Sequence, residues 1–467
     1  MRLVSTLVAI AMALLAPDPA PGQDHAVTPG PIEGRPGGPA VSPLQVLIDR
    51  AHPGDRIEVE PGSYHGDVLI DKTVTLVGRG RPRLTGSGQG SVIRVSAGHV
   101  TIEGLDIDGG GGGDLGRDSS GIHVAAPGVT IRDCHISGAL FGIYLRAADG
   151  ATVDHNRVRG IPRLDPGEKG SGIHVWNTDG FRLIRNEIID VRDGFYIQSS
   201  PHGYLSHNVA RDLRYGLHFM FSDDNVFEDN VFENGAAGAA LMYSKRITFR
   251  RNQFLHNRGF ASVGLLLKAC DDVLAEDNLI ADNARGIFLE GSYRSVFRRN
   301  VVAESDVAVV LYDSCANTRF AGNSFVANLT PLNLVGRRTD TVFDGNYWSD
   351  NDSPDLDADG ITDRPYRLSN IFDHLRGNLT AADLFAQGLA ATALAAAERS
   401  FPVLEPIPVE DHQPLARPPE LAHVPRPART TRGIRPAGIG LSVLALAGGL
   451  AAALGGRLPK PSHKDQP

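Results

Sequence analysis

The chain is poor in sulfur-containing residues: its 467 residues include three cysteines and four methionines. Cys134, Cys270 and Cys315 lie far apart in the sequence, so a disulfide framework is not expected even in an oxidising compartment. An excess of positive charge is also lacking, because the formal net charge is −8. A nucleic-acid partner would normally need a basic stripe, so the composition argues against that class of protein.

Long stretches of helical periodicity are missing from the middle of the chain, where short alternating runs are punctuated by Gly, Asn and Asp. Asparagines recur there at separations of 30, 22, 22, 22, 26, 22, 23 and 23 residues. They are Asn156, Asn186, Asn208, Asn230, Asn252, Asn278, Asn300, Asn323 and Asn346. Such a period predicts an all-β solenoid, a right-handed parallel β-helix of about ten coils of ~22 residues with a stacked asparagine ladder.

Three coils contain a longer connection in the same turn. The distance from an asparagine to the next strand glycine is normally eight residues, but it is sixteen from Asn156 to Gly172 and twelve from Asn252 to Gly264. A glycine-rich run before Gly121 lengthens the same turn. Insertions gathered on one edge indicate either a functional surface or a turn in which extra residues are tolerated.

The two ends of the chain differ from the repeats. Arg2 followed by an apolar stretch predicts a secretory signal peptide, and twenty uncharged residues near the C-terminus are enough to span a bilayer. A disordered Gly/Ala tail is the alternative for that last stretch. The predicted segments are a signal peptide (1–22), a disordered segment (23–40), the β-helix with a short capping helix at its start (41–348), an acidic loop region (349–380), an α-helical extension (381–401), a proline-rich linker (402–436), a candidate transmembrane helix (437–456) and a charged tail (457–467). We therefore expect an exported protein, with a single membrane anchor if residues 437–456 form a helix.

Each strand of the form Gly-apolar-x-apolar is expected to point its x residue outward. Two outward columns follow, one of His123, Tyr144, His174, Tyr196, His218, Ala240, Leu266, Phe288 and Val310, and one of Trp176, Gln198, Met220, Met242, Lys268, Glu290 and Tyr312. Met220 and Met242 are the only methionines outside the signal peptide, and they occupy adjacent rungs beside His218. Thioether sulfur favours Cu(I) and imidazole is an acceptable companion ligand, so these three residues predict a copper site.

The same surface has a second interpretation. Methionine is adaptable at binding surfaces, so the methionine pair and its neighbours are also consistent with a docking patch for another protein. The predicted partner-binding face consists of Trp176, Tyr196, Leu266 and Phe288.

An acidic run after the last repeat resembles the first half of a calcium-binding loop. Asp355, Asp357, Asp359 and Asp363 alternate with other residues around Gly360, and hard cations require several oxygens that converge at a tight turn. Tyr366 stands where such a loop would place a bidentate glutamate. Calcium binding and a hydrated acidic turn are therefore both open.

Many parallel β-solenoids cleave polysaccharides, and such an enzyme needs two or three carboxylates that face one groove. Here the acidic pair 223–224 aligns with the basic pair 245–246 and then with the acidic pair 271–272. Alternating signs are typical of a structural ion-pair ladder. The sequence thus favours a protein that is not an enzyme, with a polysaccharide-binding or polysaccharide-cleaving protein as the alternative.

Four stretches of the chain resemble the NosD family of nitrous oxide reductase maturation proteins, over residues 41 to 410. They are PGDRIEVEPGSYHGDVLIDKTVTLVG, GLHFMFSDDNVFEDN, GNYWSDNDSPDLDADGITDRPYRLS and ERSFPVLEPIPV. The resemblance implies a periplasmic right-handed β-helix with a non-catalytic role. It also implies work with an ABC-type ATPase and permease and a copper-chaperone lipoprotein, to mature the copper centres of nitrous oxide reductase.

Within that resemblance, His218 and Met220 fall in the family-like HFMFSDDN segment, which implies that copper, as a transient cargo, is handled at this face. The segment DLDADG departs from the more glycine-rich acidic loop of the family. If residues 437–456 form a membrane helix, packing against the permease is expected.

Overall fold

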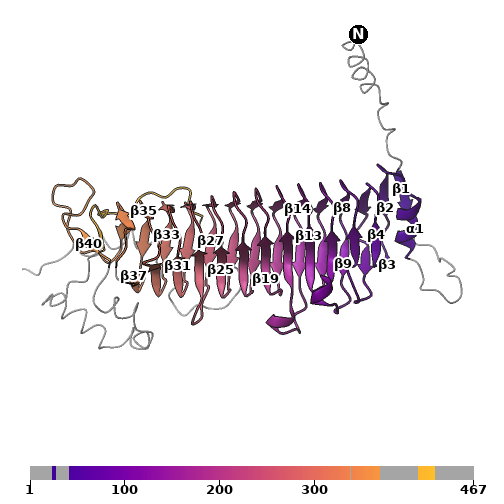
Figure 1. Cartoon of the computed structure of the whole chain (residues 1–467), viewed down its shortest axis with the longest axis horizontal. Coiled ribbons are helices and arrows are strands. Elements are labelled where there is room, and N and C mark those ends of the chain that lie inside the picture. Colours follow the sequence, from indigo (N-terminus) through magenta and orange to yellow (C-terminus); the bar gives the residue numbers. More distant parts are fainter. Residues whose placement is uncertain (1–23, 28–41, 337, 369–408, 426–467) are drawn as a thin grey trace, which may run out of the picture. The chain divides into compact units, whose positions relative to one another are not determined.

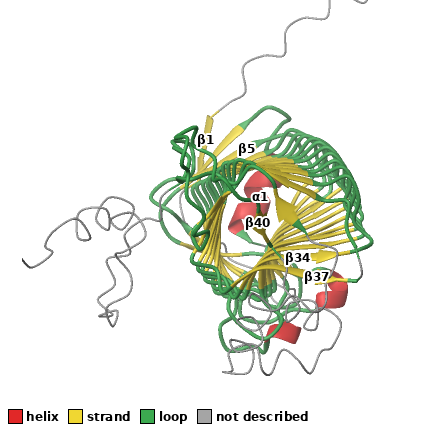
Figure 2. Cartoon of the chain, turned by 90° about the vertical axis from the view of Figure 1, so that its left-hand side faces the viewer, coloured by secondary structure: helices red, strands yellow, loops and turns green. Residues whose placement is uncertain are grey.

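The computed structural model describes residues 24–27, 42–336, 338–368 and 409–425. Strands of successive coils pair in parallel, so the coils of the solenoid stack side by side (Figure 1). Viewed along the stack, the strands form three walls around a closed interior (Figure 2). The parallel β-solenoid predicted from the period is confirmed.

The first wall is a 16-stranded sheet made of β1 (Asp24–Val27), β2 (Arg56–Val59), β5 (Thr75–Gly78), β8 (Thr101–Glu103), β11 (Thr130–Arg132), β14 (Thr152–Asp154), β17 (Arg182–Ile184), β20 (Tyr204–Ser206), β23 (Val226–Glu228), β26 (Thr248–Arg250), β29 (Leu274–Glu276), β32 (Val296–Arg298), β35 (Arg319–Ala321), β38 (Val342–Asp344), β41 (Glu410–Asp411) and β40 (Tyr366–Arg367).

The second wall is a 12-stranded sheet made of β4 (Val68–Ile70), β7 (Ile93–Val95), β10 (Ser120–Val124), β13 (Phe141–Arg146), β16 (Ser171–Trp176), β19 (Asp193–Gln198), β22 (Tyr215–Met220), β25 (Ala237–Met242), β28 (Val263–Lys268), β31 (Arg285–Glu290), β34 (Val307–Tyr312) and β37 (Thr330–Val335).

The third wall is a 13-stranded sheet made of β3 (Ser63–His65), β6 (Arg83–Thr85), β9 (Asp106–Asp108), β12 (His135–Ser137), β15 (Arg157–Arg159), β18 (Glu187–Ile189), β21 (Val209–Arg211), β24 (Val231–Glu233), β27 (Gln253–Leu255), β30 (Leu279–Ala281), β33 (Val301–Ala303), β36 (Ser324–Val326) and β39 (Tyr347–Trp348). The described helices are α1 (Pro43–Arg50) and the 3₁₀ turns η1 (Leu115–Arg117) and η2 (Pro166–Glu168).

The solenoid has more coils than the asparagine period predicts. The 13-stranded sheet contributes one strand to each coil, whereas the period predicts about ten coils. In the first four coils the ladder position is held by Gly62, Pro82, Leu105 and Cys134, whose carbonyls accept the same inter-coil hydrogen bond as the asparagine carbonyls that follow. The early coils are therefore invisible to a count of asparagines, although their backbone geometry is the same.

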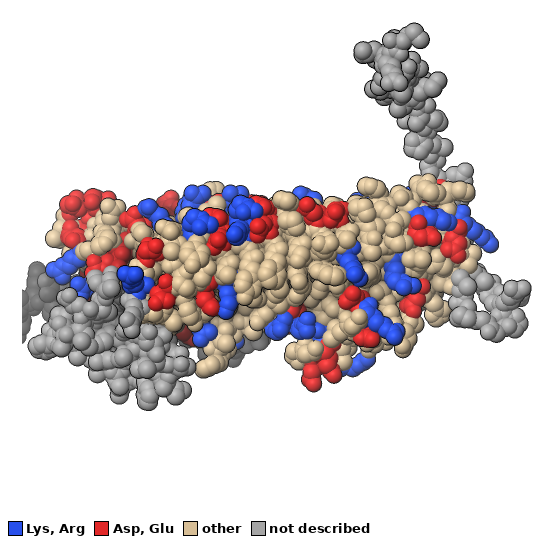
Figure 3. All heavy atoms as spheres, in the orientation of Figure 1, with Lys and Arg blue, Asp and Glu red and all other residues tan. Residues whose placement is uncertain are grey.

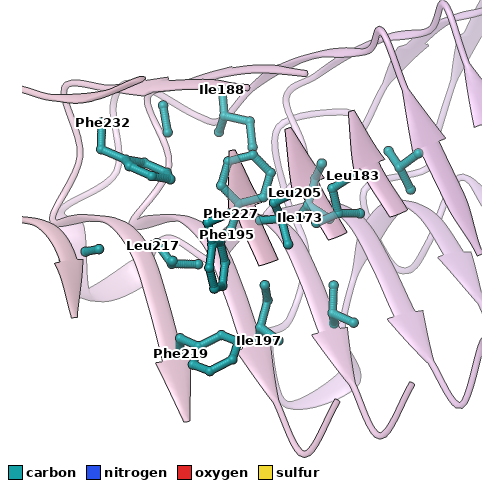
Figure 4. Packing of buried hydrophobic residues seen from close by; sticks show 14 of the residues in the cluster. Ile173, Leu183, Ile188, Phe195, Ile197, Leu205, Leu217, Phe219, Phe227 and Phe232 are labelled. Atoms are coloured by element: carbon teal, nitrogen blue, oxygen red, sulfur yellow. The ribbon is translucent and has the colours of Figure 1, made fainter. Parts of the chain in front are cut away.

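Inside the stack, the asparagines form a directional hydrogen-bonded ladder. The backbone N–H and side-chain Nδ2 of Asn230 both donate to Oδ1 of Asn252, at 3.1 and 2.9 Å, and Nδ2 also donates to the Leu205 carbonyl at 3.0 Å. Beside the ladder, apolar side chains such as Phe195, Phe227 and Phe232 fill the interior (Figure 4). The rings of Phe227 and Phe249 stack with centroids 4.8 Å apart. Satisfied polar rungs and close-packed apolar rungs together fix the register from coil to coil.

The first coil is covered by α1, as the sequence predicts. Its apolar side chains Leu44 and Ile48 are buried, and Lys72 donates to three carbonyls at its C-terminal end, where the helix dipole favours a cation. The segment 23–40, expected to be disordered, contains β1, which pairs in parallel with β2. The edge of β2 offers unpaired backbone groups, so a short strand can add there without a strong pattern of its own.

The last coil is covered by a segment that the sequence analysis assigns to a linker (402–436). Its strand β41 pairs with β38 and β40, and Leu415 bridges to Tyr347 and Ile361. Among the described residues, no helix is long and apolar enough to cross a membrane. The predicted signal peptide (1–22), C-terminal helix (381–401), candidate transmembrane helix (437–456) and charged tail (457–467) lie outside the described residues.

The long connections all lie between the 13-stranded and 12-stranded sheets. They precede β10, β16 and β28, and the first two contain η1 and η2. Two of them project from the lower edge of the stack in Figure 1. The insertions therefore border the 12-stranded sheet, whose outer face carries the two predicted columns.

Candidate functional site

The outward columns have the register that the sequence predicts. In the 12-stranded sheet, Met220 pairs directly with Met242, and His218 pairs with Tyr196 on one side. The alternate residues Phe219 and Leu241 are buried in the interior, whereas Met220 and Met242 are half-buried on the outer face. Because neighbouring strands are about 4.8 Å apart, both thioethers and the imidazole belong to one small surface area.

The first column forms a stack of rings that ends at His218. His123, Tyr144, His174 and Tyr196 stack face to face, with the His174 ring 4.3 Å from Tyr144 and 4.5 Å from Tyr196. Burial, reinforced by Arg192, lowers the pKa of His174 to about 3, so this imidazole is neutral. His218 breaks the pattern, because it meets Tyr196 edge to face at 4.8 Å. It is the one ring of the column placed beside the methionine pair.

His218 is held by a buried carboxylate that the sequence analysis missed. Its Nδ1 lies 3.3 Å from Oδ2 of Asp193, a fully buried carboxylate. Arg214 donates to both oxygens of Asp193, at 2.8 and 2.6 Å. Burial acts to raise the pKa of Asp193, but its hydrogen bonds with His218 and Arg214 outweigh burial and the pKa is lowered. A charged residue directly before the strand glycine was the only sequence signal for this pair.

Two exposed aromatic residues border the methionines, and the sequence analysis missed these also. Phe221 and Tyr243 follow Met220 and Met242 directly, and their rings stack with centroids 5.1 Å apart. Both adopt left-handed backbone conformations, with φ of 52° and 54°, which bulky residues rarely adopt. The two residues are 53% and 49% exposed. An exposed aromatic pair therefore follows directly after the two methionines.

The predicted partner-binding residues lie on the same outer face. Trp176 is covered by the guanidinium of Arg146, whose Cζ is 4.8 Å from the ring centroid. The Tyr196 hydroxyl donates to Gln198 at 2.9 Å. Leu266 and Phe288 pack on a small cluster formed by Ala237, Ala240 and Val263. All four residues are half-buried, so part of each side chain remains accessible.

Charged side chains gather along the borders of this face and leave its middle largely uncharged (Figure 3). One border is the predicted ion-pair ladder, in which Arg246 binds Asp224 at 2.7 Å and Arg294 binds Asp272 at 2.7 Å. On the first wall, burial alone would raise the pKa of Glu276, but Arg250 and Arg298 lower it to about 2. These carboxylates are ionised partners of arginines, which is unlike the paired acid and base of a glycosidase.

The acidic loop brings three of its four predicted residues together. Carboxylate oxygens of Asp355, Asp357 and Asp359 all lie within 4.8 Å of one another. Asp363 instead accepts a hydrogen bond from the backbone N–H of Leu356 at 3.2 Å. The loop packs against the end of the solenoid, where the Gly360 carbonyl accepts a hydrogen bond from the backbone N–H of Ala416. Calcium binding at this loop stays a prediction.

Comparison with known proteins gives one consistent family. The model of the family described as "Periplasmic copper-binding protein (NosD)" matches residues 159–353. A probable ABC transporter binding protein NosD of Pseudomonas aeruginosa is 29% identical over 404 residues, which cover 82% of this chain and 93% of the relative. The protein of the same name from Stutzerimonas stutzeri is 28% identical over 390 residues, 78% of this chain and 87% of the relative. The chain is therefore similar to NosD proteins over about four fifths of its length.

Solved structures similar to this NosD-like protein agree with it in fold alone. The Dettilon tailspike protein has a TM-score of 0.50 at 11% identity, over 60% of this chain and 62% of the tailspike chain. A PL6 alginate lyase in complex with a trisaccharide has a TM-score of 0.50 at 15% identity, over 65% of this chain and 82% of the lyase. At such low identity these similarities support the parallel β-solenoid and no particular chemistry.

Proposed function

We propose that this NosD-like protein is a periplasmic copper-binding scaffold, which acts as an accessory of an ABC transporter in maturing the copper centres of nitrous oxide reductase. The description of the matched family and the names of the two relatives support this proposal. Copper is the transient cargo. The proposed partners are the ATPase and permease of the transporter, a copper-chaperone lipoprotein and nitrous oxide reductase itself.

One observation carries the copper assignment. Met220 and Met242 occupy neighbouring rungs on the outer face, and His218 stands in the next column of the same strand as Met220. Two thioethers and one imidazole form a soft donor set that suits Cu(I). The half-buried position of the methionines also suits a cargo, because a partner can reach ligands that lie on an outer face.

The surface around this donor set suits a protein partner. Phe221 and Tyr243 are about half exposed beside the methionines, and Leu266 and Phe288 extend the apolar area along the next two strands. Exposed contiguous apolar surface of this kind marks interaction sites in soluble proteins. We therefore extend the proposed partner-binding face, which includes Trp176 and Tyr196, to the exposed aromatic pair.

The copper assignment is tested by titrating the full chain with Cu(I) against a colorimetric competitor. Replacing both methionines by leucine (M220L/M242L) keeps apolar bulk and removes sulfur, so the affinity should fall on the order of 100-fold or more, about 3 kcal/mol. Gln198→Leu is the matched control, because Gln198 occupies the rung next to Met220 and contributes no sulfur. Equal affinities for all three proteins would exclude this site.

A second test separates the scaffold from a polysaccharide enzyme. The full chain is incubated with a panel of acidic glycans, and product release is followed by reducing-end or unsaturated-product assays. The scaffold predicts no turnover, because Asp224, Asp272 and Glu276 are engaged by arginines. Release of oligosaccharides from any glycan would contradict the proposal that the protein is not an enzyme.

Attachment to the inner membrane, through the permease or through residues 437–456, is part of the proposal. Cell fractionation followed by an alkaline carbonate wash tests it directly. A protein anchored by its own helix resists the wash, whereas one held by the permease is released. Recovery in the soluble periplasmic fraction before any wash would contradict both routes.

A further inference from the structure

His218 is surrounded by groups that restrict the orientation of its ring. Tyr196 and Tyr215 meet the imidazole edge to face, with centroids 4.8 and 5.2 Å away. The side chain is only 12% exposed. Its Nδ1 is directed at Asp193, so the ring is held by packing on two sides and by a polar contact at one nitrogen.

The polar contact decides which nitrogen carries the proton. Asp193 is fully buried, and both of its oxygens accept hydrogen bonds from Arg214. A carboxylate held in this way can only accept, so the nitrogen that faces it must be an N–H donor. In a neutral imidazole the other nitrogen then has a free lone pair.

We infer that Asp193, fixed by Arg214, is a positioning residue that holds His218 with Nδ1 protonated and Nε2 free to bind Cu(I). This inference rests on the proposed function, since it assumes that copper is bound at His218. Histidines that bind metals usually donate their second N–H to a carboxylate or carbonyl, which orients the ring and makes it a better ligand. Here the carboxylate is present and oriented by an arginine from the adjacent coil.

The other histidine–aspartate pairs on the surface provide a contrast. His202 lies 2.7 Å from Asp179, but the His202 side chain is 61% exposed and that of Asp179 is 54% exposed. Among the described residues no arginine pairs with the Asp179 carboxylate, and neither His202 nor Asp179 belongs to the copper-site columns. This pair has the same two side chains without the restricted geometry, so Asp179→Asn is a matched control.

The tautomer can be tested without copper. Full-length protein labelled with ¹⁵N-histidine is analysed by long-range ¹H–¹⁵N correlation spectra, and the His218 signals are identified by their absence in His218→Gln. We expect a protonated Nδ1 and an unprotonated Nε2 in the native protein, and a mixture of tautomers in Asp193→Asn. An unprotonated Nδ1 in the native protein would overturn the inference, whatever binds at the site.

Copper titration tests the consequence for binding. Asp193→Asn should weaken Cu(I) binding about 10- to 100-fold, and Asp193→Glu should recover part of the loss, whereas Asp179→Asn should bind as the native protein does. If Asp193→Asn does not fold, Arg214→Gln replaces it in the test, because this variant removes the arginine that hydrogen-bonds the Asp193 carboxylate. Native affinity in these variants together with loss in M220L/M242L would overturn the positioning role and leave the proposed function standing. Native affinity in all of them would overturn both.

Discussion

The asparagine ladder ends at the carboxylate of Asp411, and the hydrogen bonds there allow a specific prediction for Asp411→Asn. Oδ2 of Asp411 accepts from the backbone N–H and Nδ2 of Asn346, both at 2.9 Å, and from Trp348 Nε1 at 3.1 Å. Oδ1 accepts from the backbone N–H groups of Gly345 and Gln413 at 3.0 and 3.2 Å. Five donors converge on one fully buried side chain, so only a group that accepts at both oxygens satisfies them.

An asparagine cannot satisfy this arrangement in either orientation of its amide. Its NH₂ group would face at least two of the five N–H donors, so two hydrogen bonds are lost and buried donors are left unpaired. Each buried donor left unpaired costs about 1–3 kcal/mol, which gives about 2–6 kcal/mol for two donors. The segment around Asp411 can relieve this cost by detaching from the last coil, so the effect should be local.

Hydrogen-exchange mass spectrometry measures this local opening. In Asp411→Asn, the protection of peptides covering 340–350 and 409–416 should fall on the order of 100-fold, while peptides around Asn230 keep native protection. The reverse substitution is the control: Asn230→Asp removes the donor Nδ2 in mid-ladder and should destabilise the central coils. Native protection at the last coil of Asp411→Asn would refute the role of the carboxylate as terminal acceptor.

Three further predictions follow from the solenoid. In its ion-pair cluster, Glu276 has a pKa of about 2 against an ordinary value of 4.5, so the native protein should be about 3 kcal/mol more stable than Glu276→Gln above pH 4.5. Because the folded-state pKa is the lower one, denaturant titrations should show this advantage shrinking as the pH falls from 4.5 towards 2. At the acidic loop, millimolar Ca²⁺ should raise the melting temperature of the native protein and leave Asp357→Asn unchanged, whereas equal shifts in both would exclude the loop as the site. In the column of strand glycines, Gly216→Ala should lower the melting temperature, since the added Cβ would lie 2.6 Å from the Gly238 carbonyl oxygen and the neighbouring strand would have to shift. The test compares the circular dichroism melting curves of this variant and of the native protein. The native protein tolerates an alanine, Ala308, elsewhere in the same column.

The sequence predicts the repeating part of this molecule well because each coil repeats the same local chemistry. Asn230 and the other ladder asparagines occupy one turn, and alternation within β22 and β25 assigns His218, Met220 and Met242 to the outer face. These features depend on a period and on strand alternation, which are both visible in a single sequence. The fold and the register of the predicted copper site follow from them.

The features that the sequence analysis missed depend on contacts without a period. Asp411 meets Asn346 across 65 residues, and no local pattern marks it as the last rung of the ladder. The early coils lack asparagine, since Leu105 and Cys134 hold its place, so the coil count is too low. Asp193 resembles any polar residue at a strand start until Arg214 and His218 are seen to converge on it.

The position of His218 in its column explains why a copper site is expected at this coil and not at the other imidazoles. On one side, His123 and His174 are enclosed in the stack of rings, and burial lowers the pKa of both. On the other side, the column continues with Ala240 and other apolar residues, which contribute no ligand atom. His218 lies where the two halves meet, next to the only rungs that contain sulfur. A soft donor set on the outer face can therefore form at this boundary, whereas the same imidazole one coil earlier would lie beside Gln198 and Trp176 instead of a methionine pair.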